Sequence, residues 1–148
     1  MTENELQLYL YQHIPLSRAM QVEVVQVSQH SIVLAAPLEP NINHQATVFG
    51  GSASAVAILA AWSLVQVRLK HAGIPNDLVI QRNSMEYGLP ISGRFTARAQ
   101  IDDGDWQAFM RMLGRKGLAR ISATSVLEFE AAAAGRLQGE FVAFARKD

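Results

Sequence analysis

The sequence predicts an α+β domain in which a curved antiparallel sheet wraps around one long helix. Residues 50–67 contain no ionisable side chain, so a helix formed there cannot lie on the surface and has to be enclosed. Later segments alternate apolar and polar residues, which is typical of strands with one wet face. A single sheet of this kind can bury an almost wholly apolar helix only by curving around it.

The N-terminal elements are predicted to be a short helix and two strands. Apolar residues at helical spacing predict a helix over residues 5–13, which Pro15 ends because the residue before a proline is pushed out of the α region. Apolar and polar residues alternate over 20–27, with a slip at Val25 that indicates a bulge or a change of partner. Residues 32–38 are more continuously apolar and predict a second strand.

The central helix is predicted to follow a loop over residues 41–49. It begins after Gly50-Gly51 and is expected to end near Ala72-Gly73, ahead of Pro75. A membrane-spanning helix needs about twenty predominantly apolar residues, whereas serines and a glutamine interrupt this segment. We therefore expect the buried helix of a soluble protein and no membrane partner.

The C-terminal half is predicted to be sheet with one helical insertion. The strands cover residues 78–85, 95–101, 119–129 and 137–145, the last with Gly139 as a candidate bulge. The insertion places Trp106, Phe109, Met110 and Leu113 on one helical stripe. We expect Asp105 to cap this helix and Gly114 to close it, which leaves Arg115 and Lys116 at the negative end of its dipole.

Composition limits the classes of function. The 148 residues fit a single domain, residues 1–148, and the 13 acidic and 13 basic residues balance, so the chain lacks the basic surplus that nucleic-acid binding needs. The absence of cysteine excludes disulfides, thiolate metal sites and a cysteine nucleophile, and it is compatible with a reducing cytosol. Glu3 and Glu5 oppose a secretory signal, so we expect a cytoplasmic location. The four histidines lack metal-ligand spacing, and no metal site is predicted.

The most informative stretch is the loop-to-helix junction over residues 36–52, which reads APLEPNINHQATVFGGS. Its two consecutive glycines leave backbone amides bare and let a ligand atom approach closely. These amides lie at the positive end of the helix dipole, where the developing oxyanion of a thioester would be stabilised. The alternative is that Gly50-Gly51 only allows a tight turn against the sheet.

The same stretch carries a family resemblance. The run Ala36-Pro-Leu-x-Pro-Asn-x-Asn, followed by Thr47-x-Phe-Gly-Gly-Ser, resembles the thioesterase family typified by the C-terminal domain of YiiD, which is similar to the phenylacetic-acid-type hot-dog thioesterases. The insertion and the run Gly114-Arg-Lys-Gly-x-Ala-Arg also resemble that family, so the likeness covers nearly the whole chain. The resemblance implies the hot-dog fold, acyl-thioester substrates and an obligate homodimer with its site between two subunits.

The resemblance also implies that the Gly51 amide polarises the thioester and that Asn43 orients the substrate or a water. Two positions depart from the wider family, since Phe49 stands in place of a histidine and residues 57–59 (Ala-Ile-Leu) in place of the carboxylate that serves as nucleophile or general base. Glu86, on the strand that faces the partner helix in hot-dog dimers, is a candidate to supply a carboxylate in trans. The alternative for Glu86 is an exposed acid on a strand.

Further residues are expected to contact the substrate. Phe49 and Gly50 border the junction, His44 is a candidate general base or a surface residue, and Thr47, Ser52 and Ser54 are hydrogen-bonding candidates, with helix capping as the alternative for Ser52. Arg115 and Lys116 belong to the chain's basic cluster with Arg111 and Arg120. They would hold coenzyme A phosphates or an acidic carrier protein, or form a solvated helix end.

The sequence therefore predicts hydrolysis of an acyl-CoA or acyl-carrier-protein thioester by a homodimer or higher oligomer. The only cofactor-like group expected is the coenzyme A carried by the substrate. The empty central helix favours an alternative, a non-catalytic acyl- or CoA-binding module that has lost its base. A dehydratase is a weaker third interpretation, because no His–acid pair follows the loop.

Overall fold

The computed structural model describes residues 1–147, and these form one antiparallel sheet with four α-helices. The helices are α1 (Glu3–His13), α2 (Pro15–Ala19), α3 (Gly50–His71) and α4 (Asp103–Lys116), and a 3-10 turn, η1, covers Glu39–Asn41. The strands are β1 (Glu23–Val27), β2 (Ile32–Ala36), β3 (Asn76–Tyr87), β4 (Phe95–Gln100), β5 (Leu118–Phe129) and β6 (Ala132–Ala145).

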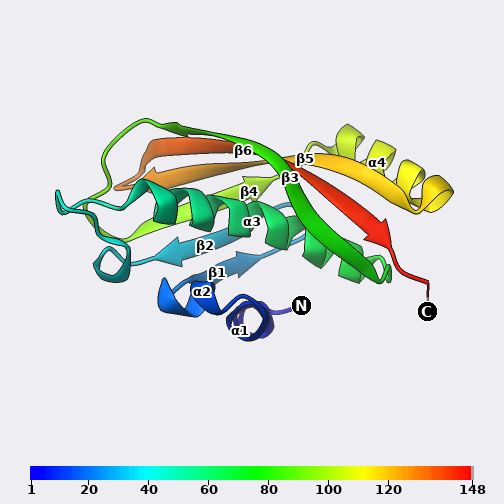
Figure 1. Ribbon diagram of the computed structural model, residues 1–148, viewed down its shortest axis with the longest axis horizontal. Coiled ribbons are helices and arrows are strands. Elements are labelled where there is room, and N and C mark those ends of the chain that lie inside the picture. The colour runs from blue at the N-terminus through cyan, green and yellow to red at the C-terminus, as the bar shows by residue number, and fades with distance from the viewer. Residues whose placement is uncertain (148) are drawn as a thin grey trace.

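The sheet is curved and α3 lies in its hollow, as the sequence predicts (Figure 1). The strand order is β1-β2-β4-β5-β6-β3, and every neighbouring pair is antiparallel. In β5 buried residues alternate with half-buried or exposed ones, so one face of the strand contacts α3 and the other faces outward. The sheet and α3 therefore share one core.

The apolar character of α3 follows from its enclosure. It has the length and composition to cross a bilayer, with a hydropathy of 1.5 over its most apolar stretch, but 61% of that stretch is buried within the protein. The buried Ser125 hydroxyl on β5 donates a hydrogen bond of 2.7 Å to the Ala57 carbonyl oxygen, which ties the helix to the sheet. Most apolar side chains of α3 are buried in the core, and Ala55, Ile58 and Trp62 are partly buried against it.

Two N-terminal details differ from the prediction. Strand β1 begins at Glu23 instead of residue 20 because Gln21 adopts a left-handed conformation (φ 57°) that forms a turn. Pro15 ends α1 as predicted, but it also opens the short helix α2 at a position where its missing N–H is not needed. The predicted bulge at Val25 is confirmed by the register shift between Val24 and Gln26.

The boundaries predicted for α4 are wrong at both ends. Asp102, not Asp105, is the N-cap, and its side chain accepts a hydrogen bond of 2.9 Å from the Asp105 amide. Gly114 lies within the helix, and Gly117 closes it in the left-handed conformation (φ 69°). Arg115 and Lys116 still occupy the last turn.

The prediction of a bulge at Gly139 is also wrong. Gly139 is paired on both sides, with Ala123 and Asn83, and the bulge in this part of the sheet lies in β3 between Ile80 and Arg82. A Cβ at position 139 would come within 3.0 Å of the Phe141 ring. The glycine therefore leaves room for a buried aromatic side chain.

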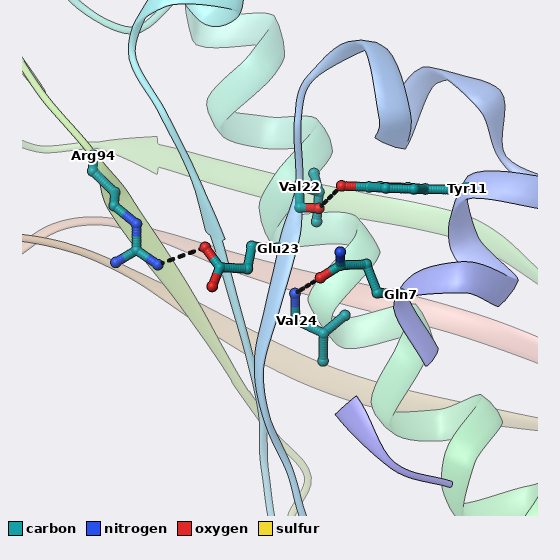
Figure 2. Close-up of polar contacts among 6 residues, drawn as sticks. All are labelled: Gln7, Tyr11, Val22, Glu23, Val24 and Arg94. Atoms are coloured by element: carbon teal, nitrogen blue, oxygen red, sulfur yellow. Dashed lines mark hydrogen bonds and ion pairs between the residues drawn. The ribbon is translucent and has the colours of Figure 1, made fainter. Parts of the chain in front are cut away.

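The two edge strands of the sheet differ in whether other parts of the chain cover their free backbone groups. At the β1 edge, Gln7 accepts a hydrogen bond of 2.9 Å from the Val24 amide and Tyr11 donates to the Val22 carbonyl oxygen (Figure 2). Glu3, one turn earlier on α1, accepts a bond of 2.9 Å from the Val27 amide. Side chains of α1 thus form hydrogen bonds with free backbone groups of β1. At the other edge, β3 has no further strand beside it among residues 1–147.

Candidate active site at the start of the central helix

The loop before α3 is closed by its own backbone hydrogen bonds. Ile42 and Val48 form an isolated antiparallel bridge, and the Asn43 amide donates to the Thr47 carbonyl oxygen over 2.8 Å. The Phe49 amide donates over 2.7 Å to the carbonyl oxygen of Asn41, a residue that is almost fully buried. The loop therefore fixes the direction in which the chain enters α3.

The half-buried Asn43 side chain forms hydrogen bonds within this loop. Its Oδ1 accepts hydrogen bonds from the Gln45 amide (2.8 Å) and the Thr47 amide (3.2 Å). Its Nδ2 donates to the Thr47 hydroxyl at 2.8 Å and to the Val48 carbonyl oxygen at 3.5 Å. These four contacts use the ordinary capacity of a side-chain amide, so the geometry favours a role in ordering the loop.

The first turn of α3 offers unpartnered donors. Phe49 is the N-cap in an extended conformation (φ −57°, ψ 133°) and makes no side-chain capping bond. The first helical hydrogen bond is donated by the Ala53 amide to the Phe49 carbonyl oxygen. Within residues 1–147 the amides of Gly50, Gly51 and Ser52 have no acceptor. Ser52 is the third residue of the helix, so the capping alternative for Ser52 is wrong.

Two exposed aromatic rings flank the glycine pair. The Tyr87 hydroxyl donates a hydrogen bond of 3.3 Å to the Gly50 carbonyl oxygen. The Phe49 ring folds over Gly51 so closely that a Cβ on Gly51 would lie 2.3 Å from Cε2 of the ring. Phe49 is 56% exposed and Tyr87 is 60% exposed. An alanine at position 51 would therefore displace the exposed Phe49 ring.

A cavity of about 260 Å³ opens beside Gly50. Apart from Tyr87 its lining side chains are apolar, and they come from α3, the loop before it, the end of β3, the segment after β3, and the strands β5 and β6. The lining residues are Val48, Gly50, Ala53, Tyr87, Gly88, Leu89, Pro90, Ile91, Leu127 and Ala134. The unpartnered amides and this cavity together can hold a polar carbonyl next to an apolar chain.

The structure brings only part of the predicted site together. Asn43, Thr47, Phe49, Gly50, Gly51 and Ser52 share the junction, while His44 is exposed in the loop. Glu86 is exposed and lies opposite Arg136 in the β3–β6 register. Because neighbouring strand residues point to opposite faces and Tyr87 reaches Gly50, the Glu86 side chain lies on the outer face of the sheet. Its catalytic role stays a prediction.

The basic cluster lies at the other end of the molecule. Arg115 and Lys116 end α4, which lies at the opposite end of the sheet from the start of α3 (Figure 1). Trp106 of α4 contacts Arg68 in the last turns of α3. One chain alone therefore does not place this cluster beside Gly51.

Sequence reasoning missed Tyr87 and the segment that follows it. The run Ser84-Met-Glu-Tyr-Gly drew attention only to its acid. The alternation of the strand puts Tyr87 on the same face as the half-buried Met85, toward α3, and this signal could have identified it. Among the described residues no group of three or more His, Asp or Glu side chains is arranged to hold a metal.

Known proteins share both the family pattern and the fold. A family model described as "Putative thioesterase (yiiD_Cterm)" matches residues 3–145. A protein of unknown function from Chlorobaculum tepidum TLS is 27% identical with a TM-score of 0.91, and the match covers 98% of each chain. A putative thioesterase from Shewanella oneidensis is 22% identical with a TM-score of 0.87, covering 96% of each. A thioesterase from Haemophilus influenzae is 13% identical with a TM-score of 0.78, covering 98% of this chain and 92% of the other. The predicted hot-dog fold is confirmed by these similarities.

Proposed function

The chain belongs to the thioesterase family typified by the C-terminal domain of YiiD, and on that basis we propose that it hydrolyses acyl-CoA or acyl-carrier-protein thioesters. The observation that carries the proposal is the set of three unpartnered amides at the start of α3, where Gly50 lines a largely apolar cavity. Fixed donors of this kind stabilise the oxyanion that forms when a nucleophile attacks a carbonyl.

In the proposed reaction a water oxygen attacks the thioester carbonyl carbon, and the carbonyl oxygen becomes an oxyanion. The Gly51 amide, with the neighbouring Gly50 amide, donates hydrogen bonds to that oxygen. Collapse of the intermediate breaks the C–S bond, and the proton lost by the water passes to the departing sulfur. The products are a carboxylic acid and a free thiol.

The proposed role of Asn43 follows from its contacts. Its amide orders the loop through hydrogen bonds to Gln45, Thr47 and Val48. In this way it positions Gly50 and Gly51 without touching the reacting atoms.

Release of free thiol from short-, long- and aromatic-chain acyl-CoAs, and from an acyl carrier protein, tests the activity. Gly50→Pro removes one amide proton at the first helical position, which suits proline, after an N-cap whose extended backbone is compatible with a following proline. Gly50→Ala is the matched control, because its Cβ would meet only the Tyr87 ring at an ordinary 3.4 Å. We expect Gly50→Pro to lower turnover on the order of a hundredfold relative to Gly50→Ala. Equal turnover in the two variants would remove Gly50 from the oxyanion site.

The second candidate function is a non-catalytic acyl- or CoA-binding module. It is favoured by Ala57, Ile58 and Leu59, which provide no carboxylate on α3. No thiol release from either substrate class, combined with a CoA or acyl species that co-purifies in native mass spectrometry, would select this alternative.

The active form is proposed to be a homodimer that pairs β3 with β3 of a second copy. Helix α1 blocks the β1 edge, whereas β3 is a 12-residue edge strand that exposes Val79. Because the chain contains no cysteine, single cysteines placed from residue 79 to 84 report this pairing directly. We expect disulfide-linked dimers from positions near the centre of β3 and none from Gln107→Cys on α4. Crosslinks with no dependence on position along β3 would contradict the arrangement.

Such a dimer offers a role for the basic cluster. Antiparallel pairing of β3 turns the second subunit around, so that its α4 lies toward the same end as Gly51 of the first. Arg115 and Lys116 of the second subunit are then proposed to bind the phosphates of coenzyme A. The double variant Arg115→Gln/Lys116→Gln should raise KM for an acyl-CoA and leave KM for the matching acyl-N-acetylcysteamine thioester, which lacks the phosphates, unchanged. An equal effect on both substrates would contradict phosphate binding.

A further inference from the structure

A second cavity, of about 630 Å³, lies at the C-terminal end of α3. It is a half-open hollow bordered by the last turns of α3, the turn between β1 and β2, the N-terminal residue and α4. The lining residues are Met1, Val27, Ser28, Gln29, Val67, Arg68, Lys70, His71, Ala72 and Trp106. At about 1.5 Å of rise per residue, Arg68 lies about 26 Å from Gly51 along the axis of α3. Within one chain this cavity is therefore separate from the candidate active site.

The charge of this cavity is unbalanced. Arg68 and Lys70 line it, and no aspartate or glutamate of the described residues does. Within residues 1–147 neither cation has an acidic partner within 4.0 Å, and neither side chain makes a hydrogen bond. Asp103 and Glu5 act on these cations only at longer range. Burial lowers the pKa of Arg68 and Asp103 partly offsets this, while hydrogen bonds to Thr2 lower the pKa of Glu5 and Lys70 adds a smaller contribution.

Arg68 is held in place although no carboxylate of residues 1–147 lies within 4.0 Å of it, and it also borders a neighbouring cavity lined by Asp102, Asp103 and Asp105. Its Cζ lies 4.2 Å from the centre of the Trp106 ring, a cation–π contact that fixes the guanidinium while leaving its N–H edge free. Burial lowers the pKa of Arg68 because it removes water from the charged group. A partly desolvated arginine with five unused donors suits a bound oxyanion.

Other side chains of this cavity add polar and apolar surface beside the two cations. The His71 Nε2 and Gln29 Nε2 atoms lie 3.0 Å apart, which joins the end of α3 to the β1–β2 turn. Val27 and Val67 form an apolar side of the cavity. The cavity therefore combines two cations with a surface for an organic group, and its size falls within the range of small-molecule sites, roughly 300–1000 Å³.

We propose that this cavity binds a small phosphate monoester. Two cations without a lining carboxylate match a group that carries nearly two negative charges at neutral pH, whereas a carboxylate would supply one. The guanidinium edge of Arg68 contacts the phosphate oxygens, Lys70 supplies the second charge, and the organic part of the ligand packs on Val27 and Val67.

The test follows the indole N–H signals of the two tryptophans by NMR during titration with AMP, inorganic phosphate or hexanoate. Trp106 borders the cavity, while the Trp62 indole donates to the Leu78 carbonyl oxygen and serves as the internal control. We expect AMP to shift the Trp106 signal and leave the Trp62 signal in place. AMP should bind more tightly than hexanoate, and its affinity should fall as salt is raised.

Two variants connect the shift to the proposed residues. Arg68→Gln should weaken AMP binding about tenfold or more, and the exposed Lys70→Gln should weaken it without a risk to folding. Arg18→Gln is the matched control, because Arg18 also stacks on a ring, that of Tyr11 at 5.5 Å, but lies outside the cavity. An unchanged Trp106 signal at millimolar AMP, or equal affinity in all variants, would overturn the site. Equal affinity for hexanoate would overturn the preference for phosphate.

Discussion

Replacing Asn43 by alanine removes the side chain that ties the loop before α3. Two acceptor contacts, to the Gln45 and Thr47 amides, and two donor contacts, to the Thr47 hydroxyl and the Val48 carbonyl oxygen, are lost together. The Gln45 contact is exposed and the Val48 contact is long at 3.5 Å, so water replaces part of the loss. With a neutral hydrogen bond contributing about 0.5–1.5 kcal/mol, the ordered loop loses about 1–3 kcal/mol.

Asn43→Asp separates loop order from direct contact with the substrate. A carboxylate still accepts from both amides, and the Thr47 hydroxyl can reverse and donate to it. Only the long 3.5 Å contact to the Val48 carbonyl oxygen is lost, because a carboxylate has no donor. If Asn43 acts only by ordering the loop, thiol release by Asn43→Asp stays near the parent value and Asn43→Ala falls roughly tenfold, since about 1.4 kcal/mol corresponds to a factor of ten.

The assay measures kcat/KM for thiol release and, on the same samples, the melting temperature. An equal and large loss in both variants, with unchanged melting, would assign the Asn43 amide a direct role on substrate or water. Full activity and unchanged melting in Asn43→Ala would refute the loop argument altogether.

Two more predictions concern the junction and the N-terminal helix. Gly51→Ala forces the Phe49 ring to move, because the new Cβ would lie 2.3 Å from it. Since Phe49 is exposed and its ring can turn into solvent, we expect a small loss of thermal stability, which Phe49→Ala relieves in the double variant. Additive effects would contradict the contact. Backbone hydrogen bonds hold the pKa of Glu3 and of Glu5 below the usual 4.5. At a pH above the unfolded-state pKa, each ionised carboxylate therefore stabilises the folded protein. This contribution is lost as the pH falls through the lowered, folded-state pKa. Glu3→Gln/Glu5→Gln should flatten the fall of melting temperature between about pH 5 and 3, and an unchanged slope would contradict the sign.

The fold was predictable because it depends on patterns that extend over many residues. The uncharged residues of α3 and the alternation in β4 and β5 identify a wrapped helix whatever the exact ends of each element. The ends were less predictable because several residues compete for them. Asp102 and Asp105 are both good caps, and only the hydrogen bond between them shows which residue is outside the helix.

The candidate site was only partly predictable, because a loop motif does not determine the directions of its side chains. The motif identified Gly50 and Gly51. The hydrogen bonds of the Asn43 side-chain amide and the hydrogen bond from Tyr87 to Gly50 depend on the folded backbone. The outward direction of Glu86 follows from its register on β3, which the sequence defines only to within a residue or two. A shift of one residue would have moved Glu86 to the face of α3.

The two sheet edges connect the fold with the proposed chemistry. Side chains of α1 occupy the backbone of β1, whereas β3 is left open on the side where Tyr87 leads into the apolar cavity beside Gly50. Helix α3 carries no carboxylate, and the outer-facing Glu86 does not approach the glycine pair within one chain. A second copy paired along β3 would bring its own side chains to the exposed rings of Phe49 and Tyr87 and bury them. The proposed dimer would complete the site, so the β3 cysteine crosslinks and the thiol-release assay should identify the same assembly as the active species.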